Sequence, residues 1–94
     1  MSQRLIKVSS KTSVKQLAGS ICHSIRQVGD ETVLQVIGAS SLNQAVKACA
    51  IARGMVAPEG LNFSIIPGFV TLQSNGKEVS GMKLILKEIG RAYV

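Results

Sequence analysis

Two short hydroxyl-rich segments contain the residue types that could bind an anion. Ser9 to Ser13 reads SSKTS and includes Lys11, and Gly38 to Gln44 reads GASSLNQ. Each follows a predicted strand and opens a predicted helix, and free backbone N–H groups at a helix N-terminus bind phosphate. Ser41 and Gln44 also match a capping box, which would satisfy those donors internally. Both readings stay open for the second segment, and the lysine makes the first the stronger candidate.

No pattern for catalysis or metal binding accompanies these segments. The five acidic residues are scattered, His23 is the only histidine, and GxSxG, HExxH and a Walker lysine are missing. Gly38 alone is not a dinucleotide fingerprint, which needs three glycines. Cys22 and Cys49 lack CxxC spacing and fall at apolar helical positions. We expect no enzymatic activity, cofactor or metal ion, and two inert buried thiols.

The charge balance favours a polyanionic partner. Eleven Lys and Arg against five Asp and Glu give the 94 residues a formal net charge of +6. Such a surplus attracts nucleic acid or an anionic membrane surface, although it can also serve solubility alone. No stretch reaches the roughly 20 apolar residues of a membrane span, and the N-terminus lacks the apolar run of a signal peptide. We expect a soluble cytoplasmic protein without a membrane partner.

Hydrophobic periodicity predicts the elements that must position these segments. Apolar residues spaced three and four apart mark two amphipathic helices, and alternating or continuous apolar runs mark four strands. Asn75-Gly76 is a strong type I′ turn signal, which makes the last two strands a hairpin. The predicted elements are a strand at 4–9, a helix at 13–29, a strand at 32–38, a helix at 41–54 and hairpin strands at 61–73 and 77–88. This βαβαββ order predicts one domain over residues 1–94.

Local signals set the boundaries of these elements. A capping box at Ser13 to Gln16 opens the first helix, and Gly29 is expected to end it. Gly54 is expected to end the second helix, since Pro58 prevents it from resuming. Pro67-Gly68 interrupts the first hairpin strand, so we expect a bulge or bend there. In the last strand, one side carries Met82, Leu84 and Leu86 and the other carries Lys83, Ile85 and Lys87.

The second helix has apolar residues on two sides. Its main apolar face, at about 100° per residue, comprises Leu42, Ala45, Val46 and Cys49. A second, uncharged stripe on the opposite side indicates burial against another copy of the chain. Arg53 would bind the last carbonyls of the helix or a residue of that partner. The expected homodimer interface comprises Ala48, Ile51, Arg53 and Met55.

The remaining basic residues allow two readings each. Base reading by the second helix is not expected, because its exposed side is polar only near the start. On the first helix, Lys15, His23 and Arg26 form either a solvated face or an extension of a basic surface. Lys77 beside the hairpin turn either keeps a tight turn soluble or contacts a minor groove or phosphates.

Three segments closely resemble the stage V sporulation protein S family of bacteria: KVSSKTSVKQLAGSI, VLQVIGASSLNQAVKACAIARGMVAPEGLN and IIPGFV. The similarity covers residues 4–88, and Leu42 to Gly54 is its most specific part. That family is similar in fold to the Alba chromatin proteins, which are dimeric and bind DNA or RNA. The resemblance implies an Alba-like α/β (α+β) two-layer sandwich, with a four-stranded mixed sheet and two helices on one face.

The resemblance also implies a function and its residues. Alba-like proteins contact polyanions through the first βα loop, the second helix region and the hairpin. The residues of this chain at those places are Lys7, Ser10, Lys11, Lys15, Asn43, Gln44, Lys47, Asn75 and Lys77. We therefore expect a homodimeric, weakly sequence-specific binder of DNA or RNA that acts in bacterial sporulation, with association with the nucleoid as one option.

The alternative is a regulatory scaffold that binds a sporulation or division protein. It would use the Ile51–Met55 surface or an open sheet face bearing Lys83, Ile85 and Lys87. A continuous basic strip from the Lys11 loop to the Lys77 hairpin would favour nucleic acid. Scattered lysines beside a large exposed apolar patch would favour a protein partner.

Overall fold

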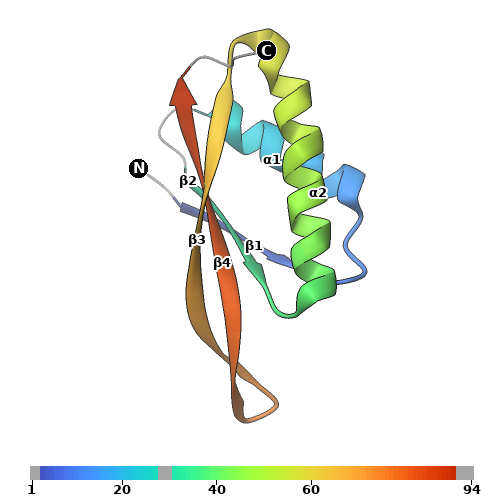
Figure 1. The fold of residues 1–94 in the computed structure, drawn as a ribbon, viewed down its shortest axis with the longest axis vertical. Helices are drawn as coiled ribbons and strands as arrows, with labels where there is room; N and C mark the ends of the chain where they lie inside the picture. Colours follow the sequence, from blue (N-terminus) through green and yellow to red (C-terminus); the bar gives the residue numbers. More distant parts are fainter. Residues whose placement is uncertain (1–2, 28–30, 91–94) are drawn as a thin grey trace.

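The computed structural model describes residues 3–27 and 31–90 and arranges them in two layers, a sheet and a pair of helices (Figure 1). The sheet has the strand order β1-β2-β4-β3. Strands β1 and β2 are parallel, and β4 is antiparallel to both of its neighbours. The elements are β1 (Gln3–Val8), α1 (Val14–Arg26), β2 (Glu31–Val36), α2 (Ala39–Val56), a 3-10 turn (Ala57–Glu59), β3 (Asn62–Ser74) and β4 (Lys77–Gly90). The predicted α+β fold with mixed sheet and βαβαββ order is confirmed.

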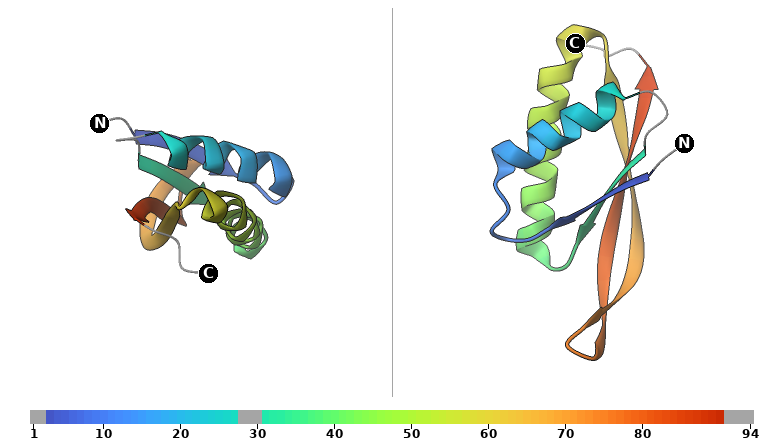
Figure 2. Two further views of the ribbon diagram at one scale, coloured as in Figure 1. Left: turned by 90° about the horizontal axis from the view of Figure 1, so that it is seen from above. Right: turned by 180° about the vertical axis from the view of Figure 1, so that it is seen from behind.

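Both helices cover the same face of the sheet, and the core lies between the layers (Figure 2). Side chains alternate between the two faces along a strand. The register sets Leu34 of β2 beside Ile6 of β1 and Leu84 of β4, and all three lie in or against the core. From α1 the core receives residues at the predicted spacing, and from α2 it receives mainly small ones. The buried apolar helix residues are Leu17, Ala18, Ile21, Cys22 and Ile25 on α1 and Ala45, Ala48, Cys49, Ala52 and Val56 on α2.

The β3–β4 hairpin is the longest feature of the fold and projects beyond the rest of the molecule (Figure 1). Its turn has positive φ at Asn75 (51°) and Gly76 (78°), as a type I′ turn requires. The bulge expected at Pro67-Gly68 is wrong, since both residues stay in register with β4 and the register shifts at Asn62/Phe63 instead. Strand β3 is an edge strand, where a proline can leave its missing N–H on the unpaired side.

The predicted helix boundaries are partly right. Ser13 caps α1 by accepting a hydrogen bond from the Gln16 backbone N–H at 3.3 Å. The expected end at Gly29 lies outside the described residues, and α1 itself ends at Arg26. The expected end of α2 at Gly54 is wrong, because the helix continues to Val56, which is 0% exposed. Burial of this last turn outweighs the roughly 1 kcal/mol that a glycine costs inside a helix.

The left-handed residue that follows α2 is Gly60, with φ of 82°, after the 3-10 turn that contains Pro58. An ion pair secures this turn to α1: Arg26 Nη2 lies 2.6 Å from Glu59 Oε2, and Arg26 Nε donates to Glu59 Oε1 at 2.9 Å. The guanidinium lowers the pKa of the Glu59 carboxyl. No helix of the described residues is long and apolar enough to span a bilayer.

Candidate functional site

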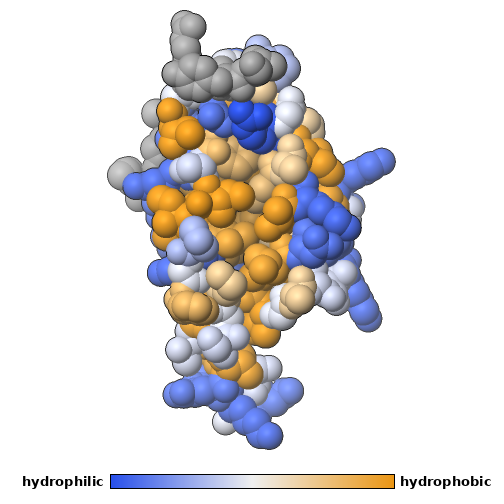
Figure 3. All heavy atoms as spheres, in the orientation of Figure 1, coloured by the Kyte–Doolittle hydropathy of each residue, from blue (hydrophilic) through white to orange (hydrophobic). Residues whose placement is uncertain are grey.

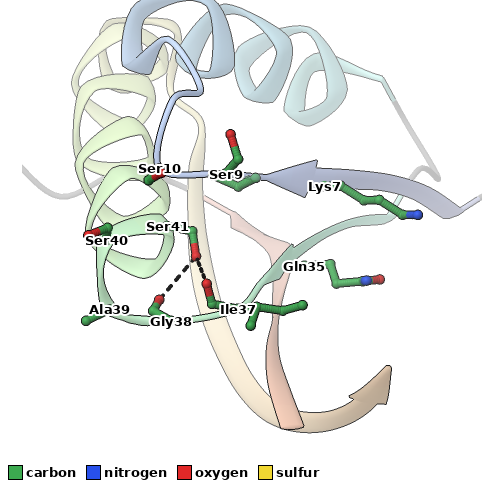
Figure 4. Close-up of a pocket in the computed structure, with 10 residues that line it drawn as sticks. Lys7, Ser9, Ser10, Gln35, Ile37, Gly38, Ala39, Ser40 and Ser41 are labelled. Atoms are coloured by element: carbon green, nitrogen blue, oxygen red, sulfur yellow. Dashed lines mark hydrogen bonds between the residues drawn. The ribbon is translucent and has the colours of Figure 1, made fainter. Parts of the chain in front are cut away.

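The carboxyl ends of the parallel strands β1 and β2 meet beside the start of α2 and form an open pocket of about 480 Å³ (Figure 4). The β1–α1 loop forms one wall, and the β2–α2 loop forms the other. Its lining residues are Lys7, Val8, Ser9, Ser10, Gln35, Ile37, Gly38, Ala39, Ser40 and Ser41. The pocket therefore brings together the two hydroxyl-rich segments that were candidates for anion binding in the sequence.

Gly38 makes the turn from β2 into α2. Its φ of 88° and ψ of 164° lie in a region that is essentially restricted to glycine. A Cβ built on Gly38 would meet no atom within 4 Å, so the backbone conformation alone demands glycine here. The turn brings the first turn of α2 directly to the pocket wall.

The capping box predicted at Ser41 and Gln44 is wrong. Helix α2 already begins at Ala39, and no side chain caps its N-terminus. Ser41, 3% exposed, instead donates its hydroxyl hydrogen toward the carbonyl oxygens of Ile37 at 2.5 Å and Gly38 at 3.1 Å (Figure 4). The internal cap that competed with anion binding is thus missing, and the amides of the first turn carry the positive end of the helix dipole.

The β1–α1 loop is held in a compact turn by its own hydroxyl groups. The Ser9 backbone N–H donates to Thr12 Oγ1 at 2.8 Å, and the Lys11 backbone N–H donates to Ser9 Oγ at 3.1 Å. Gln44 on α2 donates its side-chain amide to the Thr12 carbonyl oxygen at 3.0 Å. Gln44 therefore fastens the β1–α1 loop to α2. The exposed side chains of Ser10 and Lys11 extend from this loop.

Two of the nine residues expected to bind a polyanion line the pocket. Lys7 and Ser10 line the pocket, and both are exposed. Asn43 and Lys47 are exposed one turn apart on α2, and the β1–α1 loop and the start of α1 contribute Lys11 and Lys15. The two hairpin residues, Asn75 and Lys77, are set apart at the tip that projects beyond this end of the molecule (Figure 1).

Sequence reasoning missed several residues of the pocket wall. Gln35 lies in register with Lys7 on the neighbouring strand, and Figure 4 shows both side chains extending to the same side. Ser9, Gly38 and Ser40, also in the wall, belong to the two hydroxyl-rich segments noted from the sequence. The available signal was topological: the carboxyl ends of adjacent parallel strands lie at one edge of a sheet, so the residues following both strands meet there.

The stretches of chain that build the pocket contain no acidic residue. The sequence has no Asp or Glu in residues 1–29 or 32–58, the two stretches that build the pocket, the loops and both helices. Glu31 begins β2 at the opposite end of that strand, and Glu59 is paired with Arg26. On the hairpin, Glu78 directly follows Lys77 and offsets its charge. The segments that build the pocket therefore carry positive charge that no acidic residue within them offsets, unlike the tip.

The structure contradicts one residue of the expected homodimer interface, Ala48. Ala48 is 0% exposed and belongs to the core of the single chain, so it cannot contact a partner. Ile51 and Met55 are exposed, but on the α1 side of the helix: the sulfur atoms of Met55 and Cys22 are 3.9 Å apart. The prediction erred because α2 packs on both the sheet and α1, which gives one helix two apolar sides within one chain.

A larger apolar patch lies on the other flank of α2. Val46, predicted to be in the core, is 47% exposed and lies seven positions before Arg53 on the same flank. Arg53 Nε donates to Asn62 Oδ1 at 3.0 Å, so this flank faces β3. Phe69 of β3 is 81% exposed on the helix-facing side, in register with Met82. We call this surface the β3–α2 patch: Leu42, Val46, Ile65, Phe69 and Met82; Figure 3 shows apolar surface between these two elements.

The two cysteines are unsuited to chemistry. Burial raises the pKa of the Cys49 thiol to about 11 and also raises the pKa of Cys22. Both thiols are therefore protonated at neutral pH, when the reactive form is the thiolate. In residues 3–27 and 31–90, no group of three or more His, Cys, Asp or Glu side chains could hold a metal ion.

The fold defines a class of protein. The structure is similar to Alba from Thermoplasma volcanium, with a TM-score of 0.61 and 16% sequence identity over 94% of this chain and 100% of that one. At this identity the likeness shows the fold, which is Alba-like.

The family follows from the sequence match. Residues 4–89 match the model of the family described as Stage V sporulation protein S (SpoVS). The chain belongs to this family, as its motifs indicated, and membership implies a role in sporulation.

Proposed function

We propose that the protein binds nucleic acid through its phosphate backbone, as a homodimer that acts in sporulation. The observation that supports this most is the concentration of cations and uncapped backbone donors around the pocket. Lys7 lines the pocket, and Lys11 lies in the β1–α1 loop that forms one of its walls. Lys15 and Lys47 lie on the helices that follow the two loops, and no acidic residue occurs in the stretches that build the pocket. Phosphate contacts by lysines and helix N-termini carry no sequence information, so binding is weakly sequence-specific.

The Alba-like fold supports the same proposal, because the Alba proteins bind DNA or RNA. The hairpin adds Asn75 and Lys77 as secondary contacts at the far end of the bound strand. Because Glu78 offsets Lys77, the loops contribute more to affinity than the tip.

The dimer joins two chains through the β3–α2 patch in place of the stripe first expected. An aromatic side chain that is 81% exposed on an apolar surface is typical of an interface. If a twofold axis passes through this patch, the interface is isologous and the same residues of both chains form it. It would also set the pockets of two chains on one particle, which doubles the number of phosphates that one binding event neutralises.

The loops are tested by one substitution and its matched control. Lys11→Ala should weaken binding to duplex DNA of any sequence by a similar factor and reduce the salt dependence by about one phosphate contact per chain. Lys87→Gln removes another exposed cation, from the last strand and away from the pocket, and should leave the affinity nearly unchanged. Fluorescence anisotropy with three unrelated DNA sequences measures both. Equal losses for the two variants would contradict the assignment of the loops as the binding site.

A further inference from the structure

The sheet has a second face, opposite the helices, and it carries an apolar row. The register sets Leu5, Val33, Ile85 and Ile66 side by side across β1, β2, β4 and β3. Leu5 is 54% exposed and Ile66 is 45% exposed, while Val33 is 6% exposed between its neighbours. A solvated sheet face is normally polar. An apolar row across all four strands indicates a surface that is covered in use.

Cations border this row. Lys83 lies in the adjacent row with Gln35 and Gly68, and Lys87 lies on the other side, beside Ser64. Lys83 extends across Gly68: a Cβ there would come within 3.1 Å of Lys83 Cε. The glycine thus gives the lysine stem a place against the strand, which keeps its charge beside the row. The acidic residue of this face in the described chain, Glu31, accepts a hydrogen bond from Gln3 Nε2 at 3.0 Å.

The surplus of lysine over Glu31 on this face disfavours a second copy of the chain as the occupant. Two such faces packed together would bring the lysines of one row against those of the other, and like charges across an interface disfavour association. An anionic partner with an apolar stripe complements both features. Adjacent strands lie about 4.8 Å apart, so the row spans roughly 14 Å, the length of about two and a half helical turns.

We propose that the open sheet face binds an amphipathic helix of another protein, with an apolar stripe flanked by Asp and Glu. Apolar side chains three and four positions apart on the helix lie along the Leu5–Ile66 row. Its carboxylates then reach Lys83 on one side and Lys87 on the other. This site is on the opposite face of the sheet from the helices and the β3–α2 patch, so a dimer keeps two copies of it. The proposal is independent of nucleic-acid binding.

A designed peptide tests the proposal. The probe is a helix of about 18 residues with leucines at positions three and four apart and glutamates on both flanks, long enough to be helical in part on its own. Its control has lysine in place of every glutamate. We expect the acidic peptide to bind at least tenfold more tightly than the lysine peptide, since like charges repel at the open face. Amide chemical shift changes should centre on Val33 and Ile85.

Variants of the full-length protein separate this face from the others. Ile66→Asn should weaken binding of the acidic peptide about tenfold through lost apolar burial, and the double variant Lys83→Gln, Lys87→Gln should weaken it threefold to tenfold, as expected for exposed charge pairs. Ile51→Asn, at a similarly exposed position on α2, is the matched control and should change nothing. Lys7 is left intact because it also lines the pocket. Thermal unfolding verifies that each variant is folded.

Three results would overturn the proposal. The first is equal affinity for the acidic and lysine peptides, and the second is a set of shift changes centred on the pocket or the β3–α2 patch. The third is that the acidic peptide does not bind, while the protein binds phosphatidylglycerol vesicles and loses that binding in the Ile66→Asn variant. Retained duplex-DNA affinity in the double lysine variant, together with lost peptide affinity, would support two separate sites.

Discussion

At the scale of single residues, Gly38 connects sequence to function most directly. The residue leaves β2 in a backbone conformation that other residues avoid, and the next residue opens α2 at the pocket. Gly38→Ala should lower the free energy of unfolding by about 1–3 kcal/mol, the cost of such backbone strain. It should also weaken DNA binding, since the first-turn amides would move. Urea unfolding and anisotropy measure the two effects.

Alanine at Gly54 is the control, for which the expected change in the free energy of unfolding has the opposite sign. Gly54 lies inside α2, and a Cβ there would meet no atom within 4 Å. Gly54→Ala should therefore raise the free energy of unfolding by about 0.5–1 kcal/mol, because alanine restricts the unfolded chain and favours a helix. If both alanine variants changed stability in the same direction, the distinction between the two glycines would be wrong.

At the scale of elements, the close approach of β4 to the end of β2 depends on Gly81. A Cβ at Gly81 would lie 2.8 Å from the Val36 carbonyl oxygen and 3.0 Å from Leu72 Cδ1. Gly81→Ala should destabilise the fold by roughly 1–3 kcal/mol through overpacking against backbone. Gly19→Ala, on an exposed and uncrowded side of α1, should not. Thermal or urea unfolding measures the stability of both variants. If Gly81→Ala is as stable as the original protein, the strands can move apart at this point at no cost.

The elements also show what sequence patterns reveal and what they leave open. The order of strands and helices, the cap at Ser13 and the hairpin turn depend on neighbouring residues, so periodicity and turn chemistry were enough to predict them. The start of α2 was wrong because Ser41, read as a cap, donates to carbonyls behind it in a turn that depends on Gly38. Ala48 was wrongly assigned to the dimer interface because it is buried in the core of the single chain, where α2 contacts α1 through residues about 30 positions apart.

The candidate site was predictable in part for the same reason. The segment Ser9 to Ser13, with Lys11, was predicted from its position beside a helix start, and Lys7 and Ser10 were implied as contacts by the family resemblance. Gln35 and Ser40 join them only through the pairing of β1 with β2, and the role of Gln44 as a link to Thr12 depends on how the two loops meet. Such contacts between distant segments leave no local pattern in a single sequence.

At the scale of the whole molecule, the dimer decides how many phosphates are neutralised together. Phe69→Asp would bury a charge in the β3–α2 patch and should weaken self-association at least about a hundredfold. Ile51→Asp, on the opposite flank of α2, should leave the dimer intact. Sedimentation equilibrium measures both. A monomeric Ile51→Asp with a dimeric Phe69→Asp would restore the interface expected from the sequence and refute the patch.

The central claim, that the protein binds nucleic acid through phosphate contacts, is tested most directly by affinity as a function of salt. A dimer that neutralises about six phosphates should give a slope of log K against log salt of about −5 on duplex DNA. The same titration with single-stranded DNA and RNA shows which form is preferred. Phe69→Asp should reduce the slope by about half, since each monomer carries one pocket. An affinity that does not change with salt, or no binding at low salt, would contradict the account.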